Sequence, residues 1–67
     1  MTEKQKALVA WMLHEAPSGC IYLKGPALRI AERLVVSGHV TREYEGGFVG
    51  AYFRLTPDGI IAAREAK

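Results

Sequence analysis

The chain has 67 residues, of which 49% are hydrophobic, and its formal net charge at pH 7 is +2. A chain of this length forms one domain and buries only roughly 60% of its unfolded surface, so we expect a small core. The single cysteine excludes an intrachain disulfide, and neither a signal-peptide pattern nor an apolar run of roughly 18 residues is present, so we expect a soluble, cytoplasmic protein.

The first predicted element is a helix from Thr2 to about Ala16, because Thr2 and Gln5 form a capping-box pattern. Its apolar face consists of Leu8, Val9, Met12, Leu13 and Ala16. A second face carries Ala7, Ala10 and His14. Trp11 lies at the border between the two faces, and two interpretations stay open for it. It is either a half-buried ring that covers the small core or part of the homodimer interface that a domain of this size often needs.

A short strand is predicted at Cys20–Lys24, where β-prone residues are bounded by glycines. Pro26 suits the first turn of a second helix, which we expect to run to about Ser37 and to end at Gly38. Its predicted buried face consists of Ala27, Leu28, Ala31, Leu34 and Val35, with Ile30 at one edge. The side chains predicted to point away from the core are Arg29, Glu32, Arg33 and Val36.

The segments 39–45 and 48–55 are predicted to pair as a β-hairpin with a two-residue turn at Gly46-Gly47. In this register, Val40 faces Phe53, Arg42 faces Ala51 and Tyr44 faces Val49. The opposite side of the hairpin carries Thr41, Glu43, Tyr52 and Arg54.

A last helix is predicted to begin after Thr56, which caps it, with Pro57 at its first position and Asp58 near the positive end of its dipole. Ile60 and Ile61 are expected to pack back onto the core. The elements together predict a small α+β domain, with the order helix, strand, helix, β-hairpin, helix, that occupies residues 1–67.

Two motifs carry a resemblance to a known fold family. The first is Leu34-x3-Gly38-His39-Val40, and the second, after the hairpin, is Phe53-Arg54-Leu55-Thr56-Pro57-Asp58-Gly59. Over residues 27–61 the chain resembles winged-helix regulators of the multidrug-resistance and phenolic-acid repressor types. The resemblance implies a winged-helix domain in which the second helix reads double-stranded DNA and the hairpin is the wing. Winged helices also bind proteins and RNA, so it implies the fold more strongly than the function.

The sequence departs from this family upstream of Pro26. A helix-turn-helix has a positioning helix before its recognition helix. Only nine residues separate Ala16 from Pro26, and they include Pro17-Ser18-Gly19 and the predicted strand. Either a single helical turn lies within residues 17–25, or the positioning helix is absent.

Four cations are the predicted nucleic-acid contacts, and all of the net positive charge lies in residues 17–44, which contain them. Arg29 and Arg33 are four residues apart on one helix face and would reach phosphates or a guanine edge. Lys24 at the helix entrance and Arg42 on the hairpin would add phosphate contacts. The alternative interpretation is a solvated face in which Glu32 and Arg33 provide a local charge balance.

The wing tip favours a different partner. Its sequence, Glu43-Tyr44-Glu45-Gly46-Gly47, is acidic, and carboxylates are repelled by the DNA backbone. The rival hypothesis is therefore a winged-helix adaptor or inhibitor, of the kind that phages and mobile elements encode, that binds another protein without binding DNA. Its interface would use the hairpin residues Glu43, Tyr44, Glu45 and Tyr52, or the exposed Val36 and Trp11.

The aromatic residues of the hairpin allow one more hypothesis. Tyr44, Phe48 and Tyr52 could stack on the bases of single-stranded nucleic acid. The alternative, which we favour from sequence, is a hairpin stabilised by cross-strand aromatic pairs.

The residues offer little for catalysis. Cys20 could pair with His14 or His39 as a reactive thiol, but a small buried cysteine is the more ordinary interpretation. One Cys and two His without a close ligand pair match no zinc pattern, and Gly46-Gly47 does not precede a helix as a phosphate loop would. We therefore expect a protein that is not an enzyme, with no metal, no cofactor and no small-molecule substrate.

Overall fold

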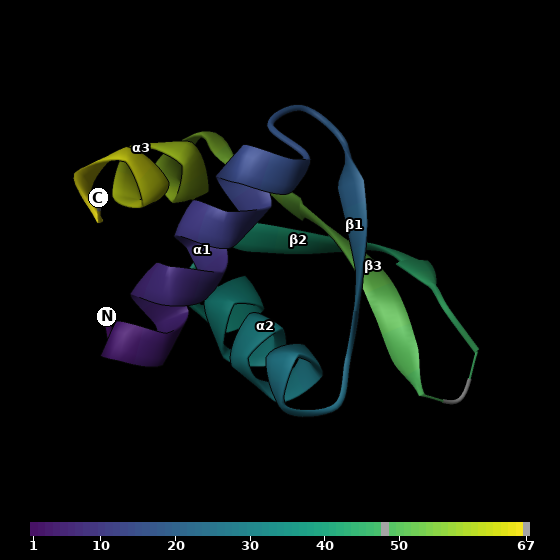
Figure 1. Ribbon diagram of the computed structural model, residues 1–67. Coiled ribbons are helices and arrows are strands. Elements are labelled where there is room, and N and C mark those ends of the chain that lie inside the picture. The colour runs from purple at the N-terminus through teal and green to yellow at the C-terminus, as the bar shows by residue number, and fades with distance from the viewer. Residues whose placement is uncertain (48, 67) are drawn as a thin grey trace.

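The structure is a computed structural model that describes residues 1–47 and 49–66. In chain order its elements are α1 (Glu3–Glu15), β1 (Cys20–Lys24), α2 (Pro26–Val36), β2 (Val40–Glu45), β3 (Gly50–Leu55) and α3 (Pro57–Glu65) (Figure 1). This order confirms the predicted α+β fold of helix, strand, helix, hairpin and helix, and the layout is winged-helix-like. Phe48, predicted to begin the second hairpin strand, lies outside the described residues; the strand begins at Gly50.

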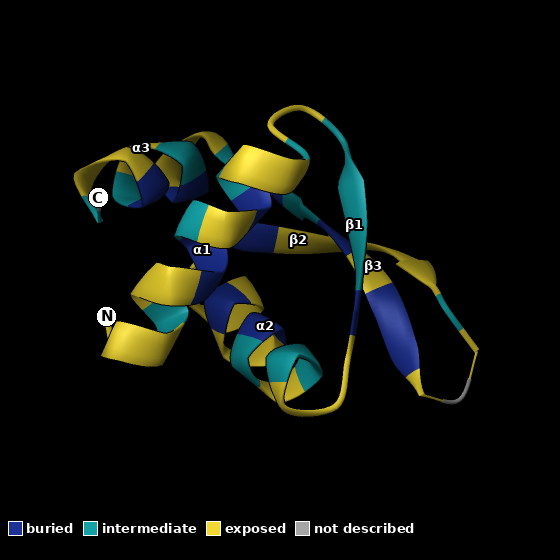
Figure 2. Ribbon diagram, in the orientation of Figure 1, coloured by how far each residue is buried: buried dark blue, intermediate teal, exposed yellow. Residues whose placement is uncertain are grey.

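The three strands form an antiparallel sheet in the order β1-β3-β2, so β3 pairs on both of its edges. Figure 1 shows α1, α2 and α3 gathered on one side of this sheet, with the β2–β3 hairpin projecting beyond them. Ala51, Phe53 and Leu55 alternate along β3 and are buried in the core with residues of the helices, and Phe53, the largest of them, is fully buried. Figure 2 shows the buried stretches of β3 in dark blue. The core consists of Leu8, Val9, Met12, Leu23, Ala31, Leu34, Val40, Ala51, Phe53, Leu55 and Ala63.

Both predicted helix caps are present. The Thr2 hydroxyl accepts a hydrogen bond from the Gln5 amide at 3.1 Å, and the Thr2 amide donates to the Gln5 side chain, which completes the capping box. Thr56 has two functions, because its hydroxyl accepts from the Gly59 amide and donates to the Gly38 carbonyl at 2.7 Å. Thr56 therefore caps α3 and also ties its start to the end of α2, where Gly38 has a φ of 85°.

Two apolar residues expected in the core are exposed instead. Val35 lies at the margin of the buried stripe of α2, beside Leu34, and within the described residues the small domain has no further element to cover it. Ile61 of α3 is also exposed, because this helix turns Gly59 and Ala63 toward the core, with Ile60 packed beside them.

The predicted hairpin register is wrong by two residues. Val40 pairs with Leu55 and Arg42 with Phe53, and a β-bulge at Glu43 then places Tyr44 opposite Tyr52. The connection between the strands is longer than two residues, because the Gly46 amide donates to the Gly50 carbonyl at 3.0 Å.

A contact from β1 explains this longer connection. The Tyr22 hydroxyl donates to the Gly46 carbonyl at 3.3 Å, and its ring lies against the backbone of Gly46 and Gly50. A Cβ atom at either glycine would collide with this ring. Tyr22 therefore fixes the base of the hairpin from the neighbouring edge strand.

The structure also decides between the two alternatives for the positioning helix. In the described part of the chain, residues 16–19 form a bend without helical structure, β1 follows at once, and α2 begins one residue after β1 ends. The positioning helix is therefore absent, and α2 stands alone as the candidate recognition helix.

Candidate nucleic-acid interface

The exposed face of α2 has the composition that the sequence predicts. Arg29, Glu32, Arg33 and Val36 are all exposed. Because Arg29 and Arg33 are four residues apart, their side chains leave the helix one turn apart on the same face. Gly25, with a φ of 62°, turns the chain sharply before Pro26 and places Lys24 just outside the helix entrance.

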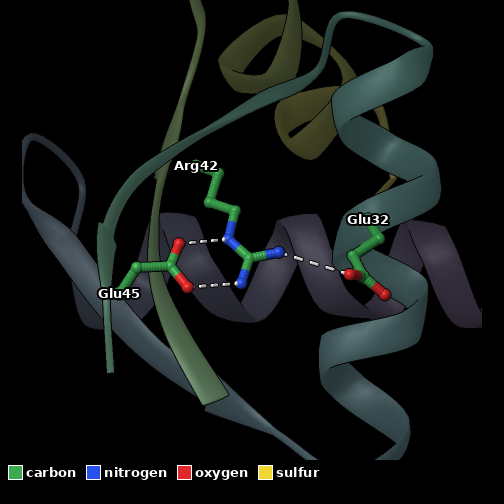
Figure 3. Close-up of polar contacts among 3 residues, drawn as sticks. All are labelled: Glu32, Arg42 and Glu45. Carbon is green, nitrogen blue, oxygen red and sulfur yellow. Dashed lines mark hydrogen bonds and ion pairs between the residues drawn. The ribbon is translucent and has the colours of Figure 1, made fainter. Parts of the chain in front are cut away.

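Arg42 lies between two carboxylates (Figure 3). Its Nε and Nη2 atoms donate to the two oxygens of Glu45, each at 3.0 Å, and its Nη1 atom donates to Oε2 of Glu32 at 3.3 Å. The bidentate pair is within β2, and the second contact joins β2 to α2. The structure thus places Arg42, a predicted phosphate contact, in an ion-pair network between the wing and the helix.

The same network gives Glu32 of α2 a partner on the hairpin. The partner of Glu32 is Arg42, and not Arg33 as the local-balance interpretation assumed. Among residues 1–47 and 49–66, the side chains of Lys24, Arg29 and Arg33 have no ion-pair partner. Together the α2 face and its network carry four cations against two carboxylates, an excess of two positive charges.

A shallow hollow lies between the start of α2 and the hairpin loop. It is lined by Gly25, Pro26, Leu28, Arg29, Glu32 and Val49. The hollow shows that the end of the wing approaches the N-terminal half of α2, beside Arg29.

The acidic wing tip is neutralised by arginines of the hairpin strands. Glu45 is paired with Arg42, and Glu43 lies 3.6 Å from the Nε atom of Arg54 while it accepts a hydrogen bond from Thr41 at 2.7 Å. The tip residues alone predict uncompensated carboxylates, because their sequence does not reveal their cross-strand neighbours. The repulsion of DNA by the tip is weaker than the sequence suggested.

The hairpin tyrosines lie on the side of the sheet that faces away from the helices. Tyr44 and Tyr52 are 62% and 40% exposed, and their rings meet edge to face with centroids 6.4 Å apart. Tyr22 on β1 extends the row, with its centroid 5.2 Å from that of Tyr52. Sequence reasoning missed Tyr22, although the alternation of the Cys20–Lys24 strand could have placed it on this side.

The two remaining predicted interface residues are also accessible. Trp11 is 45% exposed on α1, and Val36 is 89% exposed at the end of α2. His14, on the same side of α1 as Trp11, is exposed as well. Exposure keeps open the hypothesis that Trp11 belongs to a dimer interface.

The groups considered for catalysis have separate partners. The Cys20 sulfur contacts Arg54, His39 shares a 2.7 Å hydrogen bond with Ser37, and His14 lies beside Glu15. Within the described residues, no group of three His, Cys, Asp or Glu side chains is arranged to hold a metal ion. Of the helices that the structure describes, none is long and apolar enough to cross a membrane.

Comparisons with known proteins add no relative. No family model, curated protein or solved structure matches this chain.

Proposed function

We propose that the protein binds double-stranded DNA through the exposed face of α2 and acts as a small winged-helix transcriptional regulator in the cytoplasm. One observation carries the proposal. Arg29 and Arg33 project one turn apart without an ion-pair partner in the described part of the chain, while Arg42 engages Glu32, the carboxylate on the same face. The helix thus presents two arginines without a partner among the described residues, and the carboxylate beside them is engaged by Arg42.

The charge distribution favours phosphate binding. Phosphates supply most of the non-specific affinity of DNA-binding proteins, and each neutralised phosphate releases counterions. Lys24 at the helix entrance and the two arginines of α2 provide three such contacts. Glu32 lies within about one helical turn of Arg29 and Arg33, about 5.4 Å along the axis and less than a Debye length of about 8–10 Å, so its contact with Arg42 matters to the potential that DNA meets.

The missing positioning helix limits the mode of docking. In a helix-turn-helix, that element crosses the DNA backbone and orients the recognition helix. Here α2 has no such support, so backbone contacts would dominate the affinity. A guanidinium of Arg29 or Arg33 would still be able to pair with a guanine edge, which gives a modest sequence preference.

The first prediction is a salt-dependent affinity for a generic duplex of about two helical turns. With three phosphate contacts, the expected slope of log K against log salt is about −2.7, so the affinity should fall roughly 40-fold between about 50 and 200 mM salt. Fluorescence anisotropy of a labelled duplex measures this slope. Absence of binding at the lower salt concentration, or a slope near zero, contradicts the proposal.

A matched pair of variants locates the site. Glu32→Gln and Glu65→Gln each raise the net charge by one, but Glu32 lies on α2 and Glu65 lies on α3. We expect Glu32→Gln to strengthen duplex binding a few-fold, because it removes a carboxylate beside Arg29 and Arg33, and Glu65→Gln to leave the affinity within twofold of wild type. Equal effects of the two variants would mean that only the overall charge matters.

We propose protein binding, without DNA, as a second candidate function, favoured by the exposure of Trp11 and Val36. The exposed side of α1 presents Ala7, Trp11 and His14 at helical spacing, which suits a close helix–helix contact in a homodimer.

In sedimentation equilibrium at micromolar concentrations we expect a dimer that Trp11→Ala converts to monomer. The matched change Ile61→Ala, at an exposed residue of α3, should leave the dimer intact. A monomeric wild type would exclude the homodimer.

A further inference from the structure

The structure aligns three tyrosines in one row across the sheet. Tyr22 of β1 pairs with Tyr52 of β3, and Tyr44 of β2 pairs with the same Tyr52 from the other side. The adjacent rings are tilted, with interplanar angles of 55° and 76°. The bulge in β2 is what brings Tyr44 into this row, because it shifts the register by one residue beyond Arg42.

The row lies on the uncovered side of the sheet. The helices pack on the opposite side, where the alternate residues Ala51, Phe53 and Leu55 are buried. Tyr22 is already engaged in holding the hairpin through its hydroxyl and ring. Among the described residues on this side of the sheet, the rings of Tyr44 and Tyr52 are exposed, whereas Tyr22 is only partly exposed.

Cations flank the row on both sides along the strands. Lys24 follows Tyr22 by two residues on β1, so it lies on the same side of the sheet, toward the hairpin loop. Arg54 follows Tyr52 by two residues on β3, toward the other end. Arg54 is held in place by the Ser18 carbonyl at 3.0 Å and by Glu43 at 3.6 Å, and its side chain stays partly exposed.

We propose that this side of the sheet binds single-stranded nucleic acid. Bases stack on the rings of Tyr44 and Tyr52, and the phosphates of the same strand pass Lys24 and Arg54. Aromatic rings with cations beside them are the combination by which proteins bind single strands with little sequence preference. Among the described residues, Lys24 and Arg54 outnumber the one carboxylate beside them, Glu43, so this side of the sheet keeps a net positive charge, which favours a nucleic-acid strand over a proline-rich peptide.

This proposal concerns a different surface from the face of α2. Only Lys24 lies near both surfaces, so variants of Lys24 cannot separate the two proposals. Variants of the tyrosines and of the α2 arginines can separate them, because neither set of side chains belongs to the other surface.

The test measures binding of a fluorescein-labelled, mixed-sequence 12-nucleotide DNA strand by anisotropy at low salt. We expect Tyr44→Ala and Tyr52→Ala each to weaken binding roughly 5- to 150-fold, the range for the loss of one stacked base. Tyr44→Phe and Tyr52→Phe should bind within twofold of wild type, because phenylalanine keeps the ring and loses only the hydroxyl. Thermal unfolding followed by circular dichroism checks that each variant is folded. If Tyr52→Ala is unfolded, the comparison of Tyr44→Ala with Tyr44→Phe still tests the proposal, because Tyr44 is the more exposed of the two residues.

Several outcomes would overturn the proposal. They are no binding of the single strand by the wild type, equal binding by the alanine variants, and an equal loss in the phenylalanine variants. Binding of a proline-rich peptide that the strand fails to displace would assign the surface to a protein instead. Duplex affinity should be unchanged by Tyr44→Ala, and single-strand affinity should be little changed by Arg29→Gln, so failure of one proposal is distinguishable from failure of the other.

Discussion

Replacing Gly59 with alanine is expected to lower the free energy of unfolding by about 1–3 kcal/mol or more, a large part of the stability of so small a domain. Gly59 is buried in the first turn of α3, where the helix begins against Gly38 and His39, the residues between α2 and β2. A Cβ atom at this position would collide with the carbonyl oxygen of His39 and would lie 3.0 Å from both its carbonyl carbon and Cδ2 of Leu55. Two of the three obstructing atoms are backbone, so a change of rotamer cannot relieve the collision.

The surrounding hydrogen bonds make relaxation costly. The His39 carbonyl accepts from the Thr56 amide at 3.1 Å, and the Thr56 hydroxyl binds both the Gly59 amide and the Gly38 carbonyl. To move α3 away from His39 would break these contacts. Overpacking of a core typically costs about 1–3 kcal/mol or more, and a domain of this size has a total stability of only about 3–10 kcal/mol.

Urea unfolding followed by circular dichroism measures the effect, and Gly19→Ala is the matched control. A Cβ atom at Gly19 would meet nothing within 4 Å, and Gly19 lies in the bend before β1. We expect the control to change the free energy of unfolding by about 0.5 kcal/mol or less. A Gly59→Ala protein as stable as this control would mean that α3 does not pack on His39 as described.

The helices and β1 were predictable from sequence because local chemistry sets their limits. Thr2 and Thr56 cap α1 and α3, Pro26 begins α2, and Gly38 ends it. Each of these signals acts within a few residues of the element that it limits, so no knowledge of the tertiary structure is needed. The α+β order of elements followed from these signals.

The hairpin register was not predictable in the same way. The Gly46-Gly47 pair suggested a two-residue turn, but the actual connection depends on Tyr22, which is 24 residues before Gly46 in the chain. A contact between distant residues thus overrode the local turn preference.

The candidate interface was predictable in its residues but not in its electrostatics. Arg29 and Arg33 are exposed as their helical positions predict. The pairing of Arg42 with Glu32 joins two elements, and helical spacing does not reveal it. The row formed by Tyr22, Tyr52 and Tyr44 requires the strand order and the bulge, neither of which the sequence predicts.

Reversing the two arginines of α2 should abolish duplex binding. The double variant Arg29→Glu, Arg33→Glu removes two of the three proposed phosphate contacts and places two new carboxylates beside Glu32. At about 0.1 M salt each lost contact costs roughly eightfold in affinity by counterion release. With the added repulsion, we expect a loss of more than about 100-fold, together with a salt slope that approaches zero.

The control for this prediction has the same net charge. Lys4→Glu with Arg64→Glu also reverses two exposed cations, but these lie on α1 and α3. If duplex affinity depends on the α2 face, this control should lose less than about tenfold, because only the long-range, screened part of the potential changes. The charge reversal on α2 leaves the buried core untouched, so both variants should unfold at temperatures close to that of the wild type. Equal losses in the two variants would show that DNA is attracted by the overall charge, and α2 would then have no special role in binding.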